Sequence, residues 1–312
     1  MEIGTLIHYL SSTCTIIFPF VGTALGQGLA SRSMLNALDE QPLAAPQLKR
    51  TFLLGLALSE TAAILSAVVG GLMFVAAPAH PTLATALAEL GILAAMAIPA
   101  TIVGFLSSLP LRATLTSIAR QPLFTSKISN LMIITISIMQ TSVILGLLIS
   151  LFIRTGLANV VTMDDGIKLL ASGLAMGLGC IGPLIGLSLF SQKVCSMAGY
   201  NRDAYQPILT FTFIAQAFIE TPILFSLLIS LVIIFNTTAP TMALLAAALA
   251  MGLGTLGPGI SSSKIATTAC TYMGEAPQLY AALSRTSVLA QGLIDASVIY
   301  ALLVALILIY GT

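Results

Sequence analysis

The sequence predicts an all-α membrane protein in which eight transmembrane helices form four tandem helical hairpins. Two features of the composition indicate this class: hydrophobic residues make up 57% of the 312 positions, and charged residues only 7%. A soluble domain usually has about 25% charged residues, so we expect the chain to lie in a membrane. The third observation, a motif that recurs along the chain, predicts the hairpins.

Eight apolar segments are long enough to cross about 30 Å of hydrocarbon as helices. None shows the alternating pattern of a transmembrane β-barrel strand. A polytopic helical chain is therefore predicted. The segments run approximately over residues 4–30, 51–77, 84–112, 129–154, 167–192, 207–235, 241–265 and 280–310.

The repeat is clearest in the second helix of each pair. Glu60 interrupts the apolar run LALSETAAIL, and steps of 80, 80 and 75 residues lead from it to Gln140, Glu220 and Asp295. Each of these four residues follows a loop position by 18 residues. The shorter last step therefore reflects a shorter connector and leaves the motif unshifted. The four loop positions are Pro42, Pro122, Arg202 and Pro277.

The chain thus divides into hairpins over residues 1–80, 81–160, 161–238 and 239–312. Each hairpin crosses the membrane twice, so all copies share one orientation, unlike transporters built from inverted repeats. The first helix of each hairpin is rich in small residues, which allow close helix packing in membranes. Clear examples are Gly22, Gly26, Gly28, Gly177, Gly179, Gly182, Gly186, Gly252, Gly254, Gly257 and Gly259.

The basic residues predict the orientation. Of 12 Lys and Arg residues, ten lie between the two helices of a pair, so we expect the hairpin loops in the cytoplasm and both termini outside. The net charge of +1 indicates no nucleic-acid partner. The ten residues are Arg32, Lys49, Arg50, Arg112, Arg120, Lys127, Lys193, Arg202, Lys264 and Arg285.

The stretch GTALGQGLASRSMLNALDEQPLAAPQLKRTFLLGLALSETAAIL resembles the c subunit of rotary ATP synthases. That family has a glycine-rich inner helix, an Arg-Gln-Pro-like loop and an outer helix with one essential carboxylate. The second hairpin keeps the triplet Arg120-Gln121-Pro122, whereas the third and fourth loops have drifted. The glycine stripe, loop and carboxyl position recur in order over essentially the whole chain. Four fused hairpins are a departure from the familiar single and double forms.

The resemblance implies a subunit of a homo-oligomeric rotor ring in an energy-coupling membrane such as a bacterial inner membrane. It implies that Glu60, Glu220 and Asp295 carry protons or sodium ions past a stator a subunit, with no cofactor and no fixed metal. Its other partners are central stalk subunits and membrane lipids. We expect no catalysis, because no Walker-type phosphate loop occurs. The loop residues that contact the stalk, or are simply solvated, are Gln41, Pro42, Arg120, Gln121 and Pro122.

The physics of a buried carboxyl agrees with this role. Low dielectric favours the neutral form, so such a group is expected to ionise only beside an aqueous path or a fixed cation. The alternative is a structural carboxyl paired with a neighbour. Gln140 cannot take up and release a proton at neutral pH. The second hairpin is therefore either a spacer without an ion or a contributor of an amide oxygen to an adjacent site.

The choice between proton and sodium depends on auxiliary ligands, because a hard cation needs several oxygens. In sodium-dependent members a glutamine lies 33 positions before the carboxylate and a hydroxyl follows it, as Gln27 and Thr61 do here. Gln27 could equally be a polar residue bonded within its own helix. Mixed retention of these groups favours protons slightly. The corresponding residues are Ser107, Leu187 and Ser262 for the glutamine and Thr141, Thr221 and Ala296 for the hydroxyl, with Gln216 and Gln291 as substitutes.

Two other functions remain open at this point: an oligomeric channel lined by carboxylates, and a secondary transporter with one substrate site. A channel would need a polar helix face, and a transporter would not need four parallel copies. Glu89, Asp164 and Asp165 are expected near the outer face and solvated. We assign no chemistry to His8 and His80. The four cysteines are interpreted as small apolar side chains.

Overall fold

The computed structural model describes residues 2–75 and 81–311. His80 lies outside this part. The described residues contain eight helices long and apolar enough to cross a membrane, which confirms the predicted number. They are longer than the apolar segments, since regular helix continues into the polar loop regions. The first hairpin consists of α1 (Glu2–Glu40) and α2 (Ala45–Val75), which are joined by a 3₁₀ turn, η1 (Pro42–Ala44).

The other three hairpins differ from the first because their first membrane helix is divided into two segments. The third hairpin's loop lacks the 3₁₀ turn that begins at a proline in the other three. The second hairpin comprises α3 (Leu83–Leu106), α4 (Ser108–Arg120), η2 (Pro122–Phe124) and α5 (Thr125–Gly156), followed by η3 (Leu157–Asn159). The third comprises α6 (Met163–Gly179), α7 (Ile181–Tyr200) and α8 (Tyr205–Phe235). The fourth comprises α9 (Thr241–Gly254), α10 (Leu256–Glu275), η4 (Pro277–Leu279) and α11 (Tyr280–Tyr310).

A proline follows each of the three divisions at the same distance. A proline ring clashes with the carbonyl four residues earlier and lacks an N–H donor. Pro110, Pro183 and Pro258 lie four residues after the last residues of α3, α6 and α9, respectively. Proline alone is not sufficient, since α1 continues through Pro19 and α3 through Pro99.

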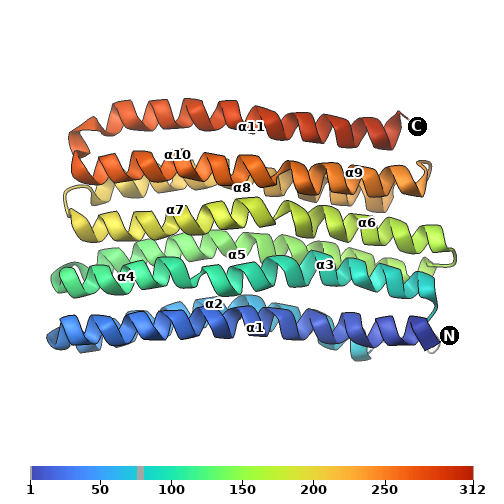
Figure 1. Ribbon diagram of the computed structural model, residues 1–312, viewed down its shortest axis with the longest axis horizontal. Coiled ribbons are helices and arrows are strands. Elements are labelled where there is room, and N and C mark those ends of the chain that lie inside the picture. The colour runs from blue at the N-terminus through green and yellow to red at the C-terminus, as the bar shows by residue number, and fades with distance from the viewer. Residues whose placement is uncertain (1, 76–80, 312) are drawn as a thin grey trace.

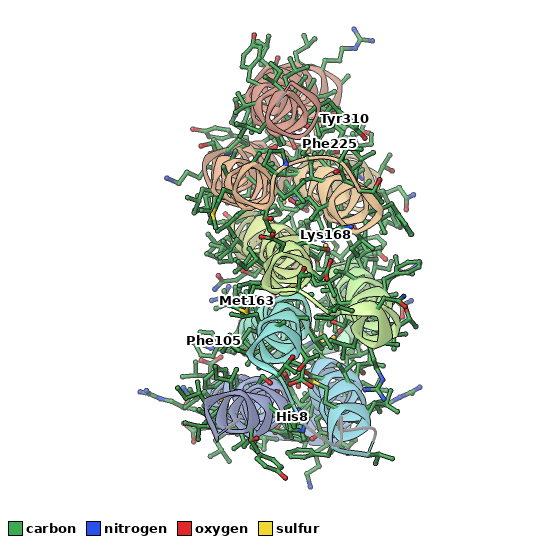
Figure 2. All side chains as sticks on the ribbon, turned by 90° about the vertical axis from the view of Figure 1, so that its right-hand side faces the viewer. His8, Phe105, Met163, Lys168, Phe225 and Tyr310 are labelled. Atoms are coloured by element: carbon green, nitrogen blue, oxygen red, sulfur yellow. The ribbon has the colours of Figure 1, made fainter. Side chains whose placement is uncertain are left out.

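The hairpins stack side by side in chain order, from α1 to α11 (Figure 1). All hairpin loops lie on the left of Figure 1, at one end of the helices, and both termini lie on the right, at the other end. Seen along the helices in Figure 2, the first and second helices of the hairpins lie in separate, adjoining rows. We call α1, α3–α4, α6–α7 and α9–α10 the first row, and α2, α5, α8 and α11 the second row. Neighbouring helices within each row contact one another.

Glycines set the spacing of the first row. A Cβ atom added to Gly22 would lie 2.6 Å from the carbonyl oxygen of Thr101, and one added to Gly26 would lie 2.7 Å from that of Gly104. Gly173 packs against Gly91, and Gly186 against Gly259, just as closely. Any side chain at these positions would push adjacent hairpins apart. This close backbone approach agrees with the packing role predicted for the small residues.

Candidate functional site

The three carboxyls and Gln140 lie in the second row, one in each hairpin. Gln27 Nε2, in α1, donates to Glu60 Oε1, in α2, at 2.8 Å. The 33-residue spacing therefore brings this glutamine level with the carboxyl of its own hairpin. Glu60 is exposed, because hairpin 1 ends the stack and nothing in the described chain covers that edge.

Gln140 lies at the boundary between hairpins 1 and 2. Its side chain is 8% exposed, and Nε2 donates to the Leu58 carbonyl of α2 at 2.7 Å. Leu58 precedes Glu60 by two residues. The Oε1 atom of Gln140 is buried, and no hydrogen-bond partner is found for it in the described part of the chain. The amide is thus tied to the neighbouring hairpin by its donor end.

Glu220 lies at the boundary between hairpins 2 and 3. Its Oε1 accepts a hydrogen bond from the Thr141 hydroxyl of α5. The same hydroxyl is 2.6 Å from the Ile138 carbonyl, a second acceptor, in its own helix. Thr141 directly follows Gln140. Both groups therefore bond the preceding hairpin close to its own carboxyl position. Glu220 bonds the residue that follows that position in hairpin 2, and Gln140 bonds the residue two before that position in hairpin 1.

Asp295 lies in α11, beside α8 of hairpin 3. Its side chain is 9% exposed, and Oδ1 is buried with no hydrogen-bond partner within residues 2–75 and 81–311. Thr221, the hydroxyl that corresponds to Thr141, donates to Ala217 of its own helix at 2.9 Å. Asp295 is thus the least hydrogen-bonded of the three carboxyls.

The other predicted auxiliary groups are bonded elsewhere. Gln216 Nε2 lies 3.2 Å from Ser191 Oγ, and Gln291 bonds both Ser262 (3.2 Å) and Ser287 (3.0 Å). The remaining hydroxyls donate to carbonyls within their own helices, Thr61 to Ala57 and Ser107 to Gly104, and Leu187 is buried. Of the described residues at the position 33 before the carboxyl, only Gln27 bonds the carboxyl itself.

The loop residues join neighbouring hairpins. Gln121 Nε2 donates to the Gly199 carbonyl of the next loop at 2.8 Å, and Arg202 Nε donates back to Gln121 Oε1 at 2.6 Å. Asn201 repeats the first contact one hairpin later, reaching the Gly274 carbonyl at 2.9 Å. Pro42 and Pro122 begin the 3₁₀ turns, the Gln41 carbonyl accepts the Ala44 N–H, and Arg120 is exposed.

The expectation that Glu89 is solvated was wrong. Glu89 is 1% exposed, and both of its carboxyl oxygens lie 2.8 Å from His8 Nδ1, which joins α1 to α3. His8, labelled in Figure 2, is itself 1% exposed. The separation of 81 residues is close to the 80-residue repeat. That agreement was the signal in the sequence that these two groups lie at one level on adjacent hairpins.

The other two acids that were expected near the outer face, Asp164 and Asp165, lie in the first turn of α6, where the third hairpin begins. Asp164 is exposed, as expected, and accepts a bond from Thr241 at 2.7 Å. Asp165 forms a capping box with Thr162 at the start of α6, which stabilises the helix terminus. Across the described residues, no three His, Cys, Asp or Glu side chains gather into a metal-binding group. All four cysteines are free, and Cys180, Cys195 and Cys270 are buried as predicted.

Fold and site together define a class: a multi-pass membrane protein of tandem hairpins with one acid or amide per second helix. The family model of the ATP synthase C subunit matches residues 10–73, 170–233 and 245–308, more than half of the chain. The chain therefore belongs to the ATP synthase C subunit family. The three matches fall in hairpins 1, 3 and 4, the three that carry a carboxyl.

Two relatives are similar to this chain over about the length of one hairpin. The c subunit of the Dehalococcoides mccartyi ATP synthase is 46% identical over 71 residues, 23% of this chain and 93% of the relative. That of Chloroflexus aurantiacus is 35% identical over 72 residues, 23% of this chain and 95% of the relative. Each relative thus corresponds in length to a single hairpin here.

Proposed function

We propose that the chain is a non-catalytic subunit of the membrane rotor of a rotary ATP synthase or ATPase, and that it carries ions on Glu60, Glu220 and Asp295. The observation that supports this most strongly is the bond between Glu220 and Thr141 across a hairpin boundary. A carboxyl held there by one hydroxyl can load and unload an ion without breaking its own hairpin.

Thr141 suits both states of a proton carrier. Its hydroxyl has one hydrogen and two acceptors in reach, the Ile138 carbonyl and Glu220. When Glu220 is ionised, the hydroxyl donates to the carboxylate. When Glu220 is protonated, the hydroxyl donates to Ile138 and accepts from the carboxyl. The switch needs only rotation of a hydroxyl, and it leaves both hairpins in place.

Gln140 acts as a permanently neutral member of the series. Its amide has the shape of a protonated glutamate, and its donor is bonded to the Leu58 carbonyl. An amide cannot release that hydrogen at neutral pH. Hairpin 2 therefore passes the stator a subunit without exchanging an ion, and each chain carries three ions on four hairpins.

Glu60 requires a partner from another copy of the chain. If the boundary between copies repeats the internal geometry, hairpin 4 of the adjacent copy lies against Glu60 and presents the Leu293 carbonyl and Ala296. Ala296 has no hydroxyl, but Gln27 supplies a donor within hairpin 1. At the two boundaries of hairpin 3, the position of Ala296 is taken by a threonine, Thr141 or Thr221. A closed ring made only of this chain contains a multiple of four hairpins.

We propose protons as the transported ion and no resident cofactor or metal. A sodium ion needs several oxygens at once, whereas the auxiliary amides Gln216 and Gln291 are engaged by serines. The loops of this rotor meet the central stalk through the surface that includes the hydrogen-bonded side chains of Gln121 and Arg202. Membrane lipids surround the second row. The loops face the cytoplasm, the termini face outward, and the membrane is energy-coupling, such as a bacterial inner membrane.

Carbodiimide labelling of the purified assembly tests the proposal. The reagent should modify Glu60, Glu220 and Asp295, and the variants Glu60→Gln, Glu220→Gln and Asp295→Asn should each lose one label. Sodium that protects these residues at neutral pH would make sodium the ion. A monomeric particle, or labelling at a single carboxyl, would contradict the rotor and favour a transporter; conduction by the isolated assembly would favour a channel.

A further inference from the structure

A cavity of about 680 Å³ lies between first-row helices in their loop-side half. Its lining comes from α1, α4, α7 and α10, with none from the second row. Three cations line it, one from each of three successive hairpins: Arg112, Lys193 and Lys264. No acidic residue is among the lining side chains, so the cavity has a net positive charge.

These cations have no counter-charge within the described chain. Among the described residues, the contact of His8 with Glu89 is the one that brings a basic side chain within salt-bridge distance of a carboxylate, and it lies in the half of the bundle away from the hairpin loops. Arg112 Nε donates to Ser33 Oγ at 3.1 Å, which orients the guanidinium at the cavity wall. Arg112 and Lys193 are half-buried, and Lys264 is exposed. Three unpaired positive groups around one cavity repel one another unless an anion lies between them.

The depth of these three cations in the membrane strengthens the argument for a bound anion. The Gln27–Glu60 bond marks the carboxyl level on the first row, and the repeat places Ser107, Leu187 and Ser262 at that level. Lys264, Arg112 and Lys193 follow these positions by two, five and six residues. At 1.5 Å per residue they lie roughly 3–9 Å nearer the loops. If the carboxyls are at mid-membrane, all three cations lie within the roughly 15 Å half-thickness of hydrocarbon, where an unpaired charge is unfavourable.

We infer that this cavity binds a phosphate group, carried by an anionic phospholipid on the face opposite the ion sites. Arginine presents a planar fork of donors that suits phosphate oxygens, and lysine supplies point charge. Gln192 and Ser196 lie in the same wall and offer neutral donors. The bound headgroup supplies one negative charge among cations from hairpins 2, 3 and 4, which reduces their mutual repulsion, and its acyl chains lie against the apolar first row. The inference goes beyond ion transport and uses only the membrane level of the carboxyls from it.

The test is phosphate retention by the complete assembly. Protein purified in mild detergent is stripped of lipid and then given short-chain phosphatidylglycerol, phosphatidylcholine or inorganic phosphate. We expect phosphatidylglycerol to bind at least tenfold more tightly than phosphatidylcholine. The triple variant Arg112→Gln/Lys193→Gln/Lys264→Gln should lose this preference. The matched variant Lys49→Gln/Arg50→Gln/Arg285→Gln, which removes three second-row charges outside the cavity, should keep it.

Single variants protect the test against misassembly. Lys193→Gln alone should weaken phosphatidylglycerol binding by at least threefold, and the ³¹P resonance of the lipid bound to the unaltered assembly should shift on binding. Equal binding of inorganic phosphate and phosphatidylglycerol would support the phosphate site but make a free phosphate its occupant. Unchanged lipid preference in both the single and triple variants would overturn it. Carbodiimide labelling should be unaffected throughout, so failure here is distinct from failure of the rotor proposal.

Discussion

The boundary between hairpins 1 and 2 and the boundary between hairpins 2 and 3 are both formed by packing within the two rows, but their polar contacts differ. The first is joined by the buried His8–Glu89 pair and by the Gln140 amide on the Leu58 carbonyl. The second is joined near the loops by Gln121 on Gly199, and at the carboxyl level by Thr141 on Glu220. An amide makes one lasting bond, whereas a carboxyl changes its bonding with its proton. Under the proposed function, replacing a carboxyl by an amide therefore converts an ion-exchanging boundary into a fixed one.

The largest effect is expected from Glu220→Gln, which makes the second boundary resemble the first. Two successive hairpins would then carry no ion, so ATP-driven proton pumping by the complete complex in vesicles should fall at least about tenfold, equivalent to about 1.4 kcal/mol in the barrier. The variant Glu40→Gln, at the exposed last residue of α1, is the control and should pump normally. Pumping by Glu220→Gln at half the normal rate or more would contradict the role of this carboxyl.

The fixed character of the first boundary can be measured at His8 and Glu89. Glu89→Leu leaves His8 Nδ1 buried without its hydrogen-bond partner and should lower the free energy of unfolding by about 1–3 kcal/mol. His8→Leu combined with Glu89→Leu removes both polar groups and should recover most of the loss. Denaturant titration of the detergent-solubilised protein follows both changes. Additive losses in the double variant would show that the two side chains do not stabilise each other.

Thr141→Val sharpens the comparison at the second boundary. The change removes a hydrogen bond from both states of Glu220, but the loss is larger for the ionised state because a hydrogen bond to a carboxylate is stronger than one between neutral groups, so the neutral carboxyl is favoured. Carbodiimide labelling of Glu220 at neutral pH should rise several-fold, as peptide mass spectrometry would record. Thr221→Val serves as the matched control, because that hydroxyl donates within its own helix. Equal labelling in both variants would remove Thr141 from the site.

The smallest effect is expected from Gln140→Leu. The loss of one buried hydrogen bond to Leu58 should lower the free energy of unfolding by about 1 kcal/mol. Pumping should stay unchanged, because a spacer carries no ion. Gln140→Glu should instead add a fourth carbodiimide label. Loss of pumping in Gln140→Leu would show that the amide serves a neighbouring ion site.

Much of the fold follows from patterns along the chain. The lengths of the apolar segments predict eight helices. The constant spacing of 18 residues predicts that the three carboxyls and Gln140 lie at one level along the second helices. The 33-residue spacing also brings Gln27 to Glu60, since both belong to one hairpin. Contacts within a hairpin depend on loop length and helical rise, which are local quantities that a sequence displays directly.

Contacts between hairpins could not be predicted in the same way. Thr141 was a candidate on its own hairpin, yet it bonds Glu220 of the next, while Gln216 turns to Ser191 instead of the carboxyl one turn away. Glu89 was expected to be solvated and His8 was assigned no chemistry, yet the two side chains bond each other between hairpins. Whether α3, α6 and α9 end before a proline also depends on packing, since Pro19 and Pro99 interrupt no helix.

The sequence by itself determined the class, the repeat and the one hairpin in four with an amide in place of an acid. Only the tertiary structure decided which neighbour each of these groups meets. The reason is that residue order encodes position along a helix, whereas the partner across a boundary depends on how far adjacent helices are rotated and shifted, and close glycine packing sets that arrangement.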